Sequence, residues 1–539
     1  MHKTTLTLVS LFFLSRAMYG QSGLTTFDDS YVHEIRVYFQ EPNFWQILSN
    51  NYFFENDDDP ATENLSLKAE VIIDGQEVSE VGVRQKGFFS NWGAGDALKK
   101  PLKLDFNEFN PDGEHDNLKS LNLQNAFKDP SFMRDVLSYR ILRDFGVAAP
   151  RTAYAKVFLN DTYWGLYVMV ESVNKTFLKE HFGDNDGNLY KANWTSLQYL
   201  GANQEAYVED FELKTNELEN DWSRLIKFLK VVNQTPNITF RDSLLKYMDM
   251  ESYFKSMAVD VTIQNWDSHF DHGRNFYLYD NPSDGKFHWI PWDYNLAFAG
   301  GFEYYDIALV NLRSQPGYDK VLPRRVLSNT TLRGEYLEVA CQLHQATFTE
   351  EHLFPVIDET EVLIAQEVEN DPNKFFHQPD VFHNSLNDGM TILQVDSFHL
   401  VDSVWNGSMW VVTDTTFIFQ YVEEFVGLKS MISERHVEIQ QELTNKYQIS
   451  CTVATSDPEA SLFSLEVWPN PATDWLQIKA EQPGLRFTIF DAQGRLLRRG
   501  EPQATQFSIP VANLPEGVYW VECRSDQGRH MKKFVINRA

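Results

Sequence analysis

The order of apolar and polar positions divides the first half of the chain into a strand-rich start and a helical continuation. Apolar and polar residues alternate over residues 33–39, 67–73, 81–87, 101–106, 153–159 and 164–170, the period of strands with one buried face. Helices are expected at about 130–145, 174–182, 219–233 and 240–265, the first between Asp129-Pro130 and Gly146. Strands with one helix, followed by a helical half, predict an α+β domain with two lobes.

The densest group of chemically active side chains surrounds a predicted β-hairpin. Strands at 276–279 and 286–290 are joined by a turn at 281–285, so the flanking residues Asn275 and Asp293 are expected side by side. Asp267 lies on the loop that enters the hairpin. Two carboxylates and an amide suit Mg²⁺, which prefers oxygen ligands, and a carboxylate there could accept a hydroxyl proton. The order Asp, Asn, hairpin, Asp is that of protein kinases, although Asn275 follows Asp267 by eight residues, a longer spacing than usual.

The two ends of the chain have characters of their own. Residues 475–479, 486–490, 506–509 and 518–521 alternate apolar with polar and predict a small all-β sandwich within 461–539. Residues 1–20 contain Lys3, an apolar run at 6–14 and a small residue, Gly20, before a polar continuation, which is typical of a secretory signal peptide. That run is too short to span a membrane, and no other segment is apolar enough, so no transmembrane segment is expected in the mature chain.

Composition and charge exclude several classes of protein. The 539 residues are 43% hydrophobic, which excludes a mostly disordered chain, and three Cys allow at most one disulfide. The net charge of −29 argues against nucleic-acid binding. Residues 461–539 carry +2, whereas residues 21–460 carry −33. This break predicts a signal peptide (1–20), a main domain (21–450), a linker (451–460) and a tail domain (461–539).

The tail contains motifs that suggest how the protein leaves the cell. In order they are Trp468-Pro469-Asn470-Pro471-Ala472, Phe490-Asp491-Ala492-Gln493-Gly494-Arg495, Leu514-Pro515-Glu516-Gly517-Val518-Tyr519 and Lys532-Lys533-Phe534-Val535. Together they resemble the type A C-terminal sorting domain of the type IX secretion system. The resemblance implies that the secretion machinery is a partner and that the protein reaches the surface or exterior of a Gram-negative bacterium through the periplasm.

A second resemblance covers about residues 28–445. It rests on Arg84-Gln85-Lys86-Gly87, Lys99-Lys100-Pro101-Leu102-Lys103-Leu104, 165–171, 187–191, Asn265-Trp266-Asp267 and Pro291-Trp292-Asp293. This order is similar to that of the spore-coat protein H (CotH) family of atypical, secreted-type protein kinases. The resemblance implies a kinase-like fold that transfers phosphate from ATP, with Mg²⁺ or Mn²⁺, to Ser or Thr of a protein.

The same resemblance implies roles for individual residues. Asp267 is the expected catalytic residue, and Asn275 and Asp293 are the expected metal ligands. Lys103 is expected at the nucleotide phosphates, with Asp135 as its ion-pair partner, and Lys100 competes with it for that role. The remaining expected nucleotide contacts are Arg84, in the turn over the phosphates, and Glu171, at the hinge beside adenine.

Two other interpretations remain open at this level. One is a catalytically inactive surface protein that keeps the fold for adhesion or scaffolding. The other is a metal-dependent hydrolase, with zinc held by His269, Asp271, His272 and His288. Retention of Asp267, Asn275 and Asp293 together favours the kinase over a scaffold. The sequence does not identify the protein substrate.

Overall fold

The computed structural model describes residues 21–52, 65–87, 89–270, 272–300, 308–310, 320–405, 410–449, 451, 465–480, 486–491, 496–500 and 502–538, the last without 503, 513, 516, 526 and 527. The chain forms two compact units, Met1–Cys451 and Thr452–Ala539. The predicted signal peptide and all but the first residue of the predicted linker lie outside the described residues. Each unit is described below by itself.

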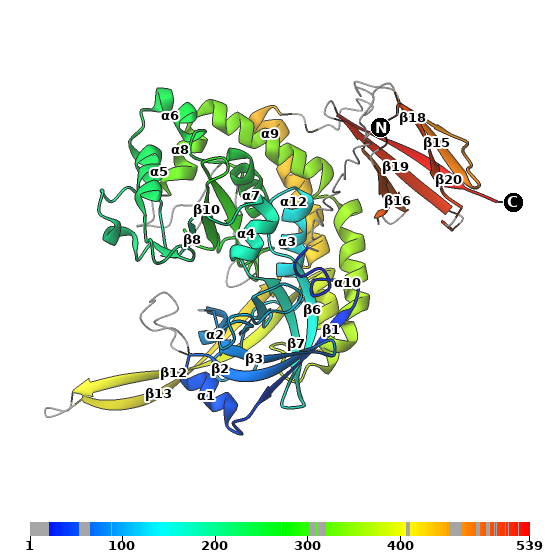
Figure 1. Ribbon diagram of the computed structural model, residues 1–539. Coiled ribbons are helices and arrows are strands. Elements are labelled where there is room, and N and C mark those ends of the chain that lie inside the picture. The colour runs from blue at the N-terminus through cyan, green and yellow to red at the C-terminus, as the bar shows by residue number, and fades with distance from the viewer. Residues whose placement is uncertain are drawn as a thin grey trace, which may run out of the picture. The chain divides into compact units, whose positions relative to one another are not determined.

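A closed β-barrel forms the first part of the larger unit (Figure 1). Its strands follow the order β1-β2-β3-β4-β5-β7-β6, and the pair that closes it, β1 with β6, is parallel. The strands are β1 (Val32–Phe39), β2 (Leu67–Ile73), β3 (Gln76–Gln85), β4 (Leu102–Asp105), β5 (Ser120–Gln124), β6 (Thr152–Leu159) and β7 (Thr162–Glu171). Two short helices, α1 (Phe44–Asn50) and α2 (Phe89–Trp92), lie in its connections.

Strand β7 explains how the barrel joins the rest of the unit. Tyr167 and Met169 belong to the core inside the barrel, whereas the alternating residues Leu166, Val168 and Val170 belong to a second core outside it. Both faces of the strand are therefore buried, as the period of two allows. Helix α3 (Arg134–Asp144) packs into the second core and lies between the barrel and the helical region (Figure 1).

The helical region surrounds a small antiparallel sheet with the order β11-β10-β8-β9. The strands are β8 (Leu189–Ala192), β9 (Phe211–Leu213), β10 (Phe276–Asn281) and β11 (Lys286–Pro291). The helices are α4 (Lys175–Phe182), η2 (Gln204–Tyr207), α5 (Ser223–Gln234), α6 (Asn237–Leu244), α7 (Met250–Thr262), α8 (Val321–Ser328), α9 (Thr330–Ala346), α12 (Leu428–Gln441) and the π-helix η3 (Glu442–Lys446). The fold is thus mixed α and β, with a large sheet and helices.

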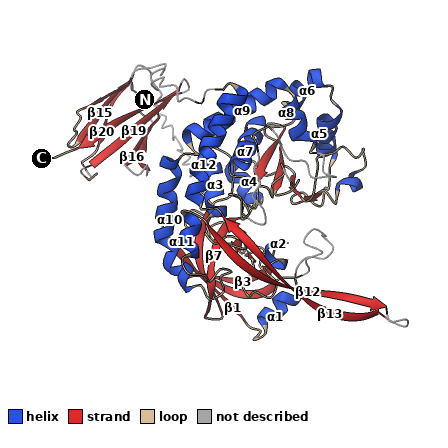
Figure 2. Ribbon diagram, turned by 180° about the vertical axis from the view of Figure 1, so that it is seen from behind, coloured by secondary structure: helices blue, strands red, loops and turns tan. Residues whose placement is uncertain are grey.

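Helix α10 (Glu350–Asn370) runs beside the barrel and is joined to it by a buried ion pair (Figure 2). Lys99 Nζ lies 2.5 Å from Asp371 Oδ2, and both side chains are fully buried. The same oxygen accepts a hydrogen bond from the backbone N–H of Leu166 in β7, at 3.0 Å. Beyond α11 (Val381–Leu386), strands β12 (Met390–Trp405) and β13 (Trp410–Phe425) pair over their full length as a ribbon that extends from the barrel (Figure 1).

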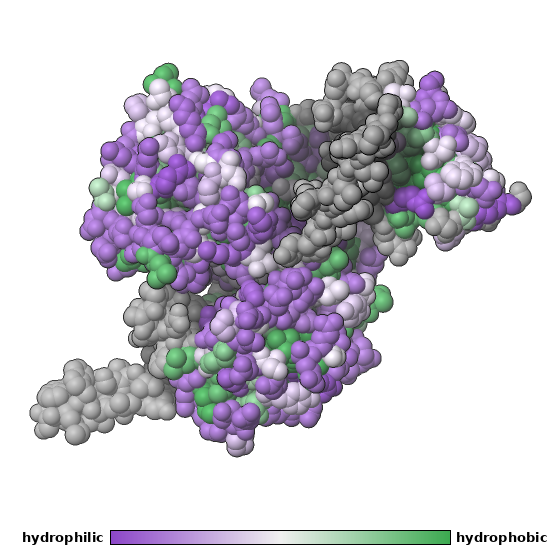
Figure 3. Space-filling model, viewed as in Figure 1, coloured by the Kyte–Doolittle hydropathy of each residue, from purple (hydrophilic) through white to green (hydrophobic). Residues whose placement is uncertain are grey.

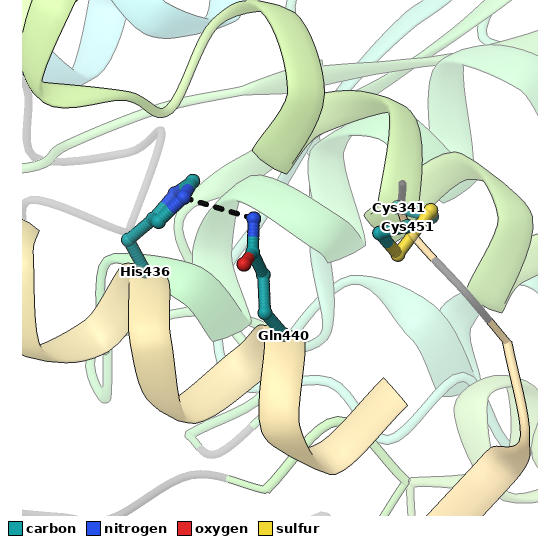
Figure 4. The surroundings of a disulfide bond; sticks show 4 residues. All are labelled: Cys341, His436, Gln440 and Cys451. Atoms are coloured by element: carbon teal, nitrogen blue, oxygen red, sulfur yellow. Dashed lines mark hydrogen bonds between the residues drawn. A yellow bond between two sulfur atoms is a disulfide. The ribbon is translucent and has the colours of Figure 1, made fainter. Parts of the chain in front are cut away.

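A disulfide fixes the end of the larger unit. Cys341 of α9 pairs with Cys451, with their Cα atoms 5.5 Å apart (Figure 4). Nearby on α12, Gln440 and His436 form a hydrogen bond of 2.9 Å between Nε2 atoms (Figure 4). The third cysteine, Cys523, is buried and forms no disulfide. Cys451, the first residue of the predicted linker, is therefore covalently attached to a helix of the main core.

Several predicted elements needed correction. The predicted helix at 240–265 is two helices, because the Asp249 carboxylate caps a new helix by accepting from the backbone N–H of Ser252. Helix α3 begins at Arg134 and not near 130, because the Asp129 side chain accepts from that residue's backbone N–H. In the larger unit, strands β5, β8, β9, β12 and β13 were not predicted. Strands β5, β8 and β9 have only five, four and three residues, and β5 is buried at every position, so these three show no clear alternation.

The smaller unit consists of two sheets with a common core. The sheets have the orders β14-β15-β18 and β17-β16-β19-β20. Their strands are β14 (Leu465–Trp468), β15 (Trp475–Ala480), β16 (Arg486–Asp491), β17 (Leu496–Gly500), β18 (Gln506–Pro510), β19 (Gly517–Ser525) and β20 (Gly528–Ile536). Leu476 and Ile478 of one sheet share a core with Ile489, Val521 and Phe534 of the other.

The visible surface of both units is predominantly hydrophilic (Figure 3). Within the residues that the structure describes, none of the helices combines the length and the apolar character that crossing a bilayer requires.

Candidate functional site

The base of the β10–β11 hairpin brings the predicted metal ligands together. Phe276 pairs with Pro291 at the end of the ladder, and the backbone N–H of Trp292 donates to Asn275 O at 3.1 Å. Asn275, just before the first strand, and Asp293, just after the second, therefore lie at the same end of the hairpin, as its turn signals predict. Both have positive φ, 64° and 61°, a conformation that tightly specified sites often hold.

Asp267 adjoins this pair from the loop after α7. Asn275 Nδ2 donates to the Asp267 backbone oxygen at 2.7 Å and to Oδ2 at 3.1 Å. Arg274 donates to Oδ1 twice, from Nε at 2.8 Å and from Nη2 at 2.6 Å. The Asp267 side chain is only 6% exposed, so these donors compensate for the burial of its charge. The structure thus brings Asp267, Asn275 and Asp293 into one cluster.

Helix α3 holds the backbone of this cluster in place. The Asp135 carboxylate accepts from the N–H of Tyr294 at 2.9 Å, and one turn later the Tyr139 hydroxyl accepts from the N–H of Asp293 at 2.9 Å. Burial, together with the charge of Asp293, raises the pKa of Asp135 well above its usual range. Burial also raises the pKa of Asp293, and Lys86 opposes this shift. The two carboxyl groups therefore lie where an additional positive charge would be stabilising.

Asp267, Arg274, Asn275 and Asp293 line a cleft of about 1160 Å³ between the barrel and the helical region. Its charged lining consists of Arg84, Lys86, Lys103, Lys119, Lys175, Lys191, Lys214 and Arg274, and of Asp105, Glu108, Glu217, Glu219, Asp267 and Asp293. Cations outnumber carboxylates here, although the whole chain carries −29. The lining of the cleft is therefore net positive although the whole protein is negative, and it suits an anionic ligand.

The barrel supplies cations from neighbouring strands. Arg84 of β3 lies directly opposite Lys103 of β4. Lys103 Nζ forms an ion pair of 3.1 Å with Asp105 Oδ2, and burial lowers the pKa of Lys103. The predicted pairing of Lys103 with Asp135 is therefore wrong, because Asp135 faces the backbone of the hairpin base.

Lys86 is the barrel lysine placed beside the acidic cluster. Its Nζ lies 5.6 Å from the ring centre of Trp292, the residue before Asp293, and donates to Gln124 Oε1 at 3.3 Å. Sequence reasoning did not assign it a role. Strand alternation could have found it, because Lys86 follows Arg84 by two residues and so continues the same outward face.

Two predicted nucleotide contacts lie outside the lining of the cleft. Lys100 Nζ donates to the backbone oxygens of Asn91 at 2.8 Å and Gly95 at 2.5 Å, and burial lowers the pKa of Lys100 to about 8. Glu171 does end β7, but its buried carboxylate accepts from Arg151 Nη2 at 2.5 Å. The residues after Glu171, Ser172 and Val173, are the ones that reach the cleft.

The predicted zinc ligands are not gathered into a site. His269 is buried among aromatic rings, His272 Nδ1 contacts the backbone oxygen of Trp266 at 2.9 Å, and His288 pairs with Asp284. Asp271 lies outside the described residues. Across the described part of the chain, no three His, Cys, Asp or Glu side chains are placed to hold a metal ion.

Comparison with known proteins agrees with both resemblances. Residues 83–388 match the CotH kinase protein family, and residues 466–537 match the secretion-system C-terminal sorting domain. The inner spore coat protein H of Bacillus subtilis (strain 168) is 28% identical in an alignment of 274 residues, and the match covers 49% of this chain and 74% of that protein.

Two solved structures are similar over short segments. One is PorZ, a surface component of the type IX secretion system of Porphyromonas gingivalis, with 25% identity and a TM-score of 0.14 over 16% of this chain and 13% of PorZ. The other is a protein from Bacteroides vulgatus with an immunoglobulin-like β-sandwich fold, with 19% identity and a TM-score of 0.13 over 14% of this chain and 94% of that protein. The first family match covers more than half of the sequence, and the chain therefore belongs to the CotH kinase protein family, with a secretion-system sorting domain as its tail.

Proposed function

We propose that this protein is a secreted kinase that transfers the terminal phosphoryl group of ATP to Ser or Thr hydroxyls of surface or extracellular proteins. The observation that supports the proposal is the lining of the cleft. It combines Asp267, a carboxylate that could act as a base, and the proposed metal ligands Asn275 and Asp293 with cations from the barrel. Phosphoryl transfer requires mainly positioning and neutralisation of charge, and this arrangement supplies both. We assign the barrel and the helical region to the two lobes of a kinase-like fold.

The residues at the hairpin base fit a divalent cation such as Mg²⁺ or Mn²⁺. Asn275 and Asp293 supply oxygen atoms, and Mg²⁺ is commonly held by one or two carboxylates together with substrate phosphates. The raised pKa values of Asp135 and Asp293 also indicate a site with too little positive charge. When bound, the ion would neutralise charge on the phosphates.

Among the cations, we assign the phosphate contact to Lys86 in preference to Lys103. Lys86 lies against Trp292, next to the metal ligand Asp293, whereas Lys103 is paired with Asp105. Phosphates that reach the hairpin base would pass closest to Lys86. Arg84 and Lys103 form the neighbouring cross-strand pair of the barrel. They would face the remaining negative charge of the nucleotide.

Asp267 is the proposed proton acceptor. Its carboxylate is buried but lines the cleft, so it can meet a hydroxyl without being fully solvated. Arg274 and Asn275 hold it in one orientation. A carboxylate so placed can orient the acceptor hydroxyl and take its proton during transfer.

The tail domain carries a separate function. A sorting domain points to secretion or a cell-surface location, and it implies interaction with the secretion machinery. We propose export by the type IX route, after removal of residues 1–20. The tail has a core of its own, and we assign it to transport and not to the chemistry of the cleft.

Incubation of the purified mature chain with radiolabelled ATP and Mg²⁺ or Mn²⁺ tests the proposal. We expect ATP to bind only with the metal and label to appear on Ser or Thr of a peptide library. Binding without transfer, or no binding at all, would contradict the kinase assignment and favour a scaffold.

A further inference from the structure

Trp194 and Arg274 form a contact that none of the roles assigned above requires. The guanidinium carbon of Arg274 lies 4.2 Å from the ring centre of Trp194, and both residues line the cleft. The same guanidinium donates to Asp267 Oδ1 from Nε and Nη2, at 2.8 and 2.6 Å. Arg274 is therefore held between an indole ring and the carboxylate that we assign to proton transfer.

The backbone brings the two loops together at this point. The N–H of Thr195 donates to Gly273 O at 2.8 Å. Gly273 has a φ of +79°, and a Cβ added there would lie 2.5 Å from Thr195 O. Only glycine fits such an approach without displacement. Trp194 and Arg274 are thus each one residue away from a tight backbone contact, and their stacking follows from it.

The hydrogen bonds distinguish the two oxygens of Asp267. Oδ1 accepts twice from Arg274, whereas Oδ2 accepts once, from Asn275 Nδ2 at 3.1 Å. A carboxylate oxygen accommodates about two hydrogen bonds. Oδ2 is therefore the oxygen with capacity for an acceptor hydroxyl. Arg274 therefore determines which Asp267 oxygen faces the acceptor hydroxyl, and the position of Arg274 depends on Trp194.

We propose that Trp194 is a positioning residue for Asp267 and acts through Arg274. The inference rests on the proposed kinase function. Trp194 is 41% exposed, so it is not required to fill the core, yet its ring covers one face of the guanidinium. Without the ring, Arg274 gains freedom to turn towards solvent, and Asp267 loses two of its three side-chain donors. Misplacement of a reacting group by about 1 Å can slow a reaction by roughly 100-fold.

The test compares Trp194→Ala, Trp194→Phe and Arg274→Lys in the mature chain, with the exposed Trp475→Ala of the tail unit as the control. ATP binding is measured by calorimetry, and transfer to the peptide library by steady-state kinetics. We expect Trp194→Ala to lower kcat by about 10-fold with unchanged ATP affinity and acceptor KM. Trp194→Phe should recover most of the rate, because a phenyl face also binds a guanidinium. Arg274→Lys should behave like Trp194→Ala, because an ammonium lacks the planar pair of donors.

The other outcomes have distinct meanings. A raised acceptor KM with unchanged kcat would make Trp194 an acceptor contact and overturn the proposal, as would wild-type kinetics in Trp194→Ala. Loss of ATP binding in Trp194→Ala would indicate a role in folding of the cleft and would also overturn it. Absence of transfer by the wild type itself would instead refute the proposed function, and this assignment with it.

Discussion

The two sides of the cleft are built on different principles. The barrel side presents Arg84 and Lys103 from paired strands and Lys86 directly after β3, where alternation decides which side chain faces outwards. The hairpin side presents Asn275 and Asp293 from positions with positive φ, each held by backbone hydrogen bonds. On the barrel side, neighbouring cations can share a role. On the hairpin side, each residue has a separate role, so we expect substitutions there to be tolerated least.

The largest effect should come from a barrel lysine that does not reach the cleft. Lys99→Ala would leave Asp371 as an unpaired buried charge, which typically costs about 3–5 kcal/mol of unfolding free energy. Denaturant unfolding of the larger unit measures this cost. The double variant Lys99→Met, Asp371→Asn should recover part of the loss, since it leaves no lone charge. Equal stability of wild type and Lys99→Ala would contradict the buried ion pair.

On the hairpin side, two substitutions should give different defects. Asp267→Asn should bind metal and ATP normally but transfer phosphate at least ~100-fold more slowly, the usual scale for loss of a general base. Asp293→Asn should lose metal-dependent ATP binding, because an amide is a poorer ligand for Mg²⁺. Calorimetric titration and label transfer on both variants separate the two roles. Identical defects in the two proteins would mean that the roles are not divided as assigned.

The buried His269 should make the hairpin side sensitive to acid. Burial, with the nearby charge of Lys320, lowers the pKa of His269 to about 3. The unfolded chain therefore binds a proton below about pH 6.5 that the folded chain does not, and stability falls as pH falls towards 3. At pH 5 protonation of His269 in the unfolded chain lowers the free energy of unfolding by about 2 kcal/mol.

We expect His269→Phe to remove this part of the pH dependence between pH 7 and pH 5, measured by denaturant unfolding at each pH. The exposed His377→Phe is the control, because its side chain is already solvated in the folded state. A pH dependence that persists in His269→Phe would assign the acid sensitivity to other groups.

The barrel side should show graded effects. Lys86→Ala should weaken ATP binding by about 10-fold, the scale of one lost hydrogen bond to a charged group. Lys103→Ala should have a smaller effect, because Lys103 is partly neutralised by Asp105, and Lys100→Ala should leave the affinity unchanged. Titration of the three variants with ATP and Mg²⁺ ranks them. A dominant loss in Lys103→Ala would restore the assignment that the sequence suggested.

The smallest effect on the cleft should follow removal of the tail. The tail has a separate core, and the Cys341–Cys451 disulfide anchors the chain before it. Deletion of residues 461–539 should therefore leave the melting temperature and ATP affinity of the remaining chain unchanged, while the protein accumulates in the periplasm. Cell fractionation and thermal unfolding measure the two outcomes. Surface delivery of the truncated protein would contradict the proposed export route.

Much of the local structure could be predicted because it depends on near neighbours. Strand β2 has the predicted bounds, and the hairpin follows from a turn signal between two alternating runs. The meeting of Asn275 with Asp293 is a consequence of that hairpin alone. Lys86 was missed. Strand alternation could have placed it on the same face as Arg84, but its position beside Trp292 depends on how the barrel packs against the hairpin.

The sequence by itself determined the strand-rich start, the hairpin, the sorting tail and the residue types available for chemistry. Apart from the neighbours on the hairpin, only the tertiary structure decided which of these residues meet. Asp135 and Tyr294 are 159 residues apart, and Lys99 and Asp371 are 272 apart, yet each pair forms a buried hydrogen bond. The periodicity of apolar residues and the residue types found in turns predict the conformation of residues that are close in the sequence. The partner of a buried polar group is set instead by the packing of distant elements, because any group left without one would be costly.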